Sequence, residues 1–112
     1  MFELGIILKV QELYNATCKT CDKLDPSKKQ TIGRHTETSL LDLLELLIMA
    51  KHAPKAHKAV YLIKASAKLE IAQFLLRSLL EQKLANKTTL HQLNSKALEI
   101  GRMLGGWLKS EK

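Results

Sequence analysis

The chain has 112 residues, of which 46% are apolar, and we expect one domain over residues 1–112 with a single hydrophobic core. Its 18 Lys and Arg against 11 Asp and Glu give a formal net charge of +7, which favours a polyanionic partner such as nucleic acid or an acidic protein surface. No apolar run is long enough to span a membrane, "MFELGIILKV" lacks the basic start of a signal peptide, and two cysteines are too few for a secreted disulfide framework. We therefore expect a cytoplasmic protein without a membrane partner.

The first half of the chain predicts two helices, because apolar residues recur there every three or four positions. In the first helix one stripe consists of Ile7, Val10, Tyr14, Thr17 and Cys21. The segment "LDPSKKQTIG" then predicts a loop, since a proline and a polar run break the pattern. The second helix covers "TETSLLDLLELLIMAKH", with Thr36 or Thr38 as its cap, and ends before Pro54.

The second half predicts two more helices. One runs from about residue 55 to about residue 84, and Asn86 or Thr88 can end it and begin the next. The apolar stripe of the fourth helix consists of Leu90, Leu93, Ala97, Ile100 and Leu104. Four amphipathic helices joined by short loops, without a strand pattern, predict an all-α fold that is an antiparallel up-down-up-down four-helix bundle.

The third helix carries two apolar stripes on nearly opposite sides. The first stripe consists of Ala56, Val60, Ile63, Ala67 and Phe74. The second stripe consists of Leu62, Ala65, Leu69, Ala72 and Leu76. A helix of a monomeric bundle usually needs one stripe, so we expect the second to be covered either by a wide core or by another subunit.

Basic residues concentrate in two parts of the chain. Residues 46–69 contain no carboxylate. Within this range Lys64, Lys68 and His57 share a narrow helix face, and Tyr61 lies at its edge. Lys55 and Lys58 project elsewhere, toward the second stripe. Such clusters attract phosphates and release counterions, and one nearby aromatic favours backbone contacts over base stacking. A solvated face that keeps the protein soluble is the alternative. With the cations around the first loop, the candidate nucleic-acid-binding residues are Lys28, Lys29, Arg34, Lys55, Lys58, Lys64 and Lys68.

Residues suited to catalysis are few. The motif "CKTC" places Cys18 and Cys21 one helical turn apart, but no second pair completes a zinc site, so we interpret both as small core residues. The histidines form neither HExxH nor ExxH, and no glycine-rich phosphate loop is present. We therefore expect no catalytic residues, no metal, no cofactor and no enzymatic activity.

The only tryptophan follows paired glycines in "EIGRMLGGWLKS". Gly101, Gly105 and Gly106 would let the end of the fourth helix approach a neighbouring backbone closely. The glycine pair can also terminate or kink the helix, so that Trp107 folds onto the end of the bundle as a packing anchor.

That segment, after "LDPSKKQTIGRH" and a Lys-rich third helix, resembles the accessory variability determinant (Avd) proteins of diversity-generating retroelements. It is also similar to their relatives, the four-helix proteins encoded by intervening sequences in bacterial 23S ribosomal RNA genes. The resemblance covers nearly the whole chain and is most specific at Leu104, Gly105, Gly106, Trp107 and Leu108.

This resemblance implies a homo-oligomer, a pentamer of four-helix bundles, that binds nucleic acid through a basic surface. The ligand would be template RNA, and also DNA or an RNA–DNA hybrid, and the partner would be the reverse transcriptase that performs mutagenic cDNA synthesis. Two alternatives stay open: an intervening-sequence type of protein with an RNA-related role, and a helical module for protein–protein interaction.

Overall fold

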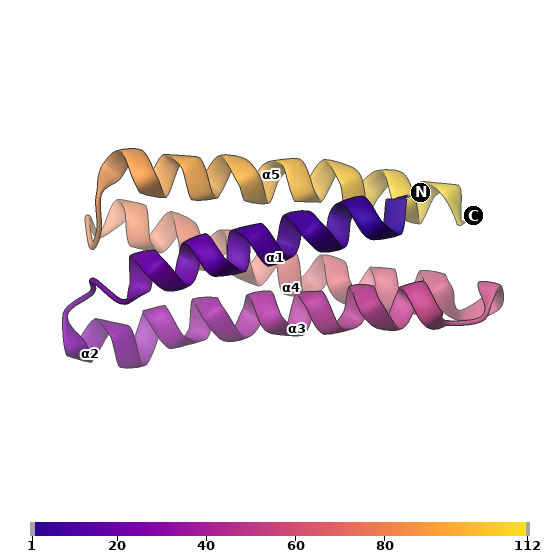
Figure 1. The fold of residues 1–112 in the computed structure, drawn as a ribbon, viewed down its shortest axis with the longest axis horizontal. Helices are drawn as coiled ribbons and strands as arrows, with labels where there is room; N and C mark the ends of the chain where they lie inside the picture. Colours follow the sequence, from indigo (N-terminus) through magenta and orange to yellow (C-terminus); the bar gives the residue numbers. More distant parts are fainter. Residues whose placement is uncertain (1, 112) are drawn as a thin grey trace.

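Four long helices make up the structure, a computed structural model that describes residues 2–111 (Figure 1). They are α1 (Phe2–Cys21), α3 (Arg34–His52), α4 (Lys55–Glu81) and α5 (Lys87–Ser110). A short helix α2 (Pro26–Lys28) and a π-helical turn (Lys29–Gly33) precede α3, and the described residues contain no strand. The prediction of an all-helical bundle with four helices is confirmed. Residues 1 and 112, the two ends of the predicted domain, lie outside the described residues.

The long helices lie side by side along a body whose longest dimension is 44 Å. Both α1 and α4 pack against α3 and α5. One end of the bundle holds the chain termini and the α3–α4 turn, and the other end holds α2 and the α4–α5 turn (Figure 1). Cations that are far apart in the sequence, around α2 and around the α4–α5 turn, therefore share one end.

The buried residues show which of the two apolar stripes of α4 faces the core. Leu62, Ala65, Leu69, Ala72 and Leu76 are all buried in one cluster with residues of α1, α3 and α5, so the core itself covers the second stripe. Each buried leucine contributes about 1.5–3 kcal/mol to folding. The first stripe lies on the outside instead: Val60 is 49% exposed, Ile63 59% and Phe74 58%, with Ile71 exposed between them.

The segment between α1 and α3 is mostly helical, so the prediction of a loop over "LDPSKKQTIG" is wrong from Pro26 onward. Pro26 is the first residue of α2, where its missing N–H costs no hydrogen bond. The Lys29 N–H donates to the Asp25 carbonyl oxygen at 2.8 Å, and helical geometry then continues into α3. The expected caps Thr36 and Thr38 consequently lie inside the helix, and the Thr36 hydroxyl donates to the Ile32 carbonyl oxygen at 2.7 Å.

The π-helical turn depends on glycine at position 33. A Cβ there would lie 3.1 Å from Leu24 Cδ1 and 3.3 Å from the Lys28 carbonyl oxygen. Both distances are tighter than ordinary contacts, and the carbonyl belongs to the backbone and has little freedom to move. Gly33 therefore lets the π-helical turn pack closely against Leu24 and the backbone of Lys28.

Helix α5 begins at the predicted cap and runs through the glycine pair. Asn86 is its N-cap, because the side-chain oxygen accepts the Thr89 N–H at 2.9 Å. The helix continues through Gly105 and Gly106 to Ser110, so the glycine pair does not terminate it. Trp107 is 1% exposed, which confirms it as a packing anchor. A Cβ on Gly105 would meet no atom within 4 Å, so no close backbone approach requires that glycine.

Thr17 provides a test of the core. Its side chain is fully buried on α1, and within the described structure its hydroxyl has no hydrogen-bond partner. Thr17→Val keeps the shape and removes the unpaired group, so we expect the free energy of unfolding to rise by about 1 kcal/mol. Urea denaturation followed by circular dichroism measures this change.

Thr20→Val is the matched control, because the Thr20 hydroxyl donates to the Ala16 carbonyl oxygen at 3.1 Å. It should give less stabilisation than Thr17→Val. A loss of stability in the Thr17 variant would contradict the unpaired state of the hydroxyl.

Candidate nucleic-acid interface

Three of the candidate cations lie at the end of the bundle that holds the α4–α5 turn (Figure 1). Lys28 belongs to α2, Lys29 to the π-helical turn, and Arg34 is the first residue of α3. All three are exposed. Lys29 Nζ lies 3.5 Å from the carboxylate oxygen of Asp22, whereas Lys28 and Arg34 form no ion pair with a described carboxylate. This end therefore presents at least two unpaired positive charges.

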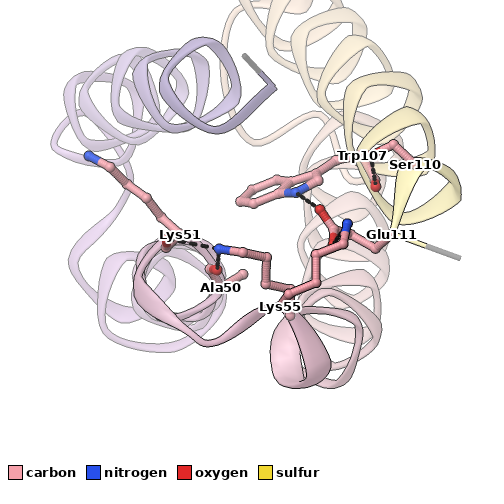
Figure 2. A network of polar contacts seen from close by, with 7 residues as sticks. Ala50, Lys51, Lys55, Trp107, Ser110 and Glu111 are labelled. Atoms are coloured by element: carbon pink, nitrogen blue, oxygen red, sulfur yellow. Dashed lines mark hydrogen bonds and ion pairs between the residues drawn. The ribbon is translucent and has the colours of Figure 1, made fainter.

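Lys55 lies at the opposite end, where it joins α4 to the end of the chain. Its Nζ is 3.1 Å from Glu111 Oε1, and the other oxygen of Glu111 accepts the Trp107 Nε1–H at 3.2 Å. Figure 2 shows Glu111 between the lysine and the indole. The carboxylate is only 11% exposed, while Lys55 is 77% exposed. Glu111 therefore neutralises much of the charge that Lys55 would offer to a ligand.

Lys58 is directed at the protein backbone. Its Nζ donates to the carbonyl oxygens of Ala50 at 2.8 Å and of Lys51 at 3.0 Å, two groups labelled in Figure 2. These carbonyls belong to the last turn of α3, where the Ala50 oxygen otherwise accepts only the long 3.4 Å hydrogen bond from the Ala53 N–H. A cation there also interacts favourably with the helix dipole. The half-buried Lys58 thus caps α3 and holds the α3–α4 turn, so its ammonium does not point to solvent.

Lys64 and Lys68 lie on the part of α4 between the two ends. Lys68 Nζ is 3.3 Å from Asp42 Oδ2 on α3. Lys64 is exposed and, among the residues described, forms no ion pair. The seven candidates therefore do not converge on one pocket, and Lys28, Arg34 and Lys64 are the ones free to contact an anion. Their spread along the bundle suits an extended polyanion bound at several points.

The two cysteines lie where α1 meets α3. Cys21 is fully buried, its Sγ donates to the Gly33 carbonyl oxygen at 3.9 Å, and burial raises the pKa of its thiol to about 12. Burial also raises the pKa of the Cys18 thiol. Both thiols stay protonated at neutral pH, and thiolate is the form that binds metals and acts as a nucleophile. In the described part of the chain, no three His, Cys, Asp or Glu side chains gather to hold a metal ion.

The family model for bAvd-like proteins matches residues 6–111. The chain belongs to the bAvd-like family. The resemblance found in the sequence is thereby confirmed, and with it the general assignment to Avd-type accessory proteins, a non-catalytic kind of protein. The chain has no significant match among curated proteins or among solved structures. None of the described helices is both long enough and apolar enough to cross a membrane.

Three more basic residues of this bAvd-like chain, which the sequence pattern did not predict as ligand-binding, lie together in the structure. Lys83, Lys87 and His91 line a hollow beside the α4–α5 turn, at the same end as Lys28 and Arg34. The signal in this segment was Asn86 or Thr88 as a cap, which predicted a helix boundary and pointed to no ligand.

Lys58 and Lys64 make a matched pair for separating structure from binding. Lys58→Met removes two charge-assisted hydrogen bonds to the end of α3, so we expect the free energy of unfolding to fall by about 1–2 kcal/mol. Lys64→Met removes a solvated charge and should change stability by less than about 0.5 kcal/mol. Chemical denaturation measures both, and equal stability of the two variants would contradict the capping role of Lys58.

Proposed function

We propose that this up-down-up-down bundle is the accessory protein of a diversity-generating retroelement. It binds template RNA and the cDNA made from it, and it associates with the reverse transcriptase. Membership of the bAvd-like family, over residues 6–111, is the observation that carries this proposal. A reverse transcriptase gene beside template and variable repeats would separate this function from that of an intervening-sequence relative.

The basic surface supports the nucleic-acid part of the proposal. Lys28, Arg34 and Lys64 are exposed and unpaired within the described structure, and each can neutralise one phosphate. The three cations are spread along the bundle and are not arranged to contact base edges in a groove, so binding should have little sequence preference. Catalysis resides in the polymerase, and this protein holds RNA and enzyme together.

The outer face of α4 supports a homo-oligomer. Val60, Ile63, Ile71 and Phe74 form an exposed apolar strip with a hollow of about 500 Å³ around the last two. Exposed apolar surface of this kind is typical of a protein–protein interface. We propose that a neighbouring copy covers this strip, in a pentamer as the family membership suggests.

Charges beside the strip favour copies that point in the same direction. At 100° per residue, Lys64 lies along one edge of the strip, and Glu70 and Glu81 lie along the other, where Arg77 offsets one of their two negative charges. Two parallel copies of α4 place the basic edge of one against the acidic edge of its neighbour. Antiparallel copies place like charges together, which disfavours that contact. Parallel copies are also what a cyclic ring requires.

RNA binding should depend on the three unpaired cations. In the variant Lys28→Glu, Arg34→Glu, Lys64→Glu, we expect single-stranded RNA affinity to fall by at least about 100-fold at low salt and the log–log salt slope to shrink by about three. Fluorescence anisotropy titrations at two salt concentrations measure both quantities.

The matched control carries the same charge change at the exposed Lys19, Lys96 and Lys109. It should retain most of the affinity. If both triple variants lose affinity equally, binding follows net charge and the surface assignment is wrong.

Subunit association should depend on the outer face of α4. Phe74→Glu places a charge on the strip, so we expect it to split the oligomer while helicity stays intact. Leu69→Glu places a charge in the core and should unfold the bundle. Light scattering and circular dichroism separate these outcomes. A parent mass near 12.6 kDa at micromolar concentration would contradict the oligomer.

A further inference from the structure

A hollow of about 620 Å³ lies beside the α4–α5 turn. Its lining consists of Leu80, Lys83, Ala85, Lys87 and His91. Two of these residues are aliphatic and three are basic, and none is a carboxylate. The volume falls in the range of small-molecule sites, and a lining of three basic and two aliphatic residues suits a ligand that has both a flat apolar part and a negative charge.

Two of the basic residues occupy positions where another residue would make the fold more stable. Lys83 follows the end of α4 with φ of 57°, the left-handed conformation in which glycine is strongly preferred. Lys87 lies in the first turn of α5, which has no acidic residue, although the helix dipole there favours negative side chains. Departures from local preference are expected where a residue serves a function.

A second hollow, of about 280 Å³, adjoins the same turn. It shares Ala85 with the first hollow and is lined by Lys23 of the α1–α2 connection. Lysine therefore lines both of the hollows that meet at Ala85. A phosphodiester chain that passes from one hollow to the other meets positive charge in each.

We propose that the larger hollow binds one unstacked nucleotide of a single-stranded nucleic acid. The base lies on Leu80 and Ala85 beside His91, and the flanking phosphates lie at Lys83 and Lys87. This rests on the proposed function and adds to it a specific site and a preference for single strands. Duplexes keep their bases stacked inside the helix, so they can place phosphates at the lysines but no base in the hollow.

The test uses two variants that should weaken binding while strengthening the fold. Lys83→Gly relieves the left-handed backbone, and Lys87→Glu places a favourable charge at the start of α5. We expect each to raise the melting temperature by a few degrees. Each should also weaken binding of a short single-stranded RNA by about tenfold and reduce the salt slope by about one. Opposite changes in stability and affinity exclude unfolding as the cause.

Lys109→Glu is the control, because it makes the same charge change in the last turn of α5, at the other end of the bundle. It should leave affinity within about twofold, since no proposed phosphate contact is lost. An RNA carrying 2-aminopurine reports on the base: its fluorescence should rise on binding to the parent protein and not to Lys83→Gly. For Lys83→Gly and Lys87→Glu, the loss of affinity should be smaller for the duplex of the same sequence than for the single strand.

Each of the other possible results contradicts a particular part of the proposal. If the parent binds RNA and the two variants bind as tightly, or if Lys109→Glu loses as much, the hollow is not a binding site and the proposed function stands. If duplex and single strand lose equally and the fluorescence does not change, the hollow holds phosphate without a base. If the parent binds no nucleic acid at low salt, the proposed function itself fails.

Discussion

Helix α4 has apolar residues on two opposite sides, and a four-helix core covers only one of them. The bundle buries the side with the leucine and alanine spacing of Leu62, Ala65, Leu69 and Ala72. Small alanines between leucines let α3 and α5 pack closely on that side. Val60, Ile63, Ile71 and Phe74 are then necessarily on the outside, with Lys64 beside them. The direction in which α4 faces the core therefore determines both the apolar strip and the position of its charges.

The helices themselves could be predicted because each has a periodic apolar side that the core uses. The connection before α3 could not be predicted from the same pattern. Its residues are mainly polar, and the proline that suggested a loop instead occupies the first helical position. The π-helical turn that follows brings Gly33 close to the Leu24 side chain and to the Lys28 carbonyl oxygen, five residues earlier. Apolar periodicity carries no information on such close contacts, so the pattern predicted a loop where the backbone is helical.

For the candidate cations, too, part of the outcome follows from the local sequence and part from the rest of the fold. Sequence spacing correctly separated the direction of Lys58 from that of Lys64, since helix geometry determines it. The partners came from elsewhere in the fold: Lys55 meets Glu111 at the far end of the chain, and Lys68 meets Asp42 on the preceding helix. Whether a lysine is available to a ligand depends on these partners. A count of lysines in the sequence overstated the free charge of α4 and overlooked the charge at the α4–α5 turn.

Several exposed residues lower the stability of the isolated bundle, and contacts within the subunit do not explain why they are there. Gly105 lies inside α5 with empty space beside its Cα, although alanine there would be more stable by about 1 kcal/mol. Lys83 has a backbone conformation suited to glycine, and Phe74 is exposed to water. By contrast, Trp107 is explained entirely within the subunit, by burial and by its hydrogen bond to Glu111. The proposed contacts account for two of these exceptions, Phe74 through another copy on α4 and Lys83 through nucleic acid at the α4–α5 turn, whereas Gly105 lies at neither surface and nothing in the structure explains it.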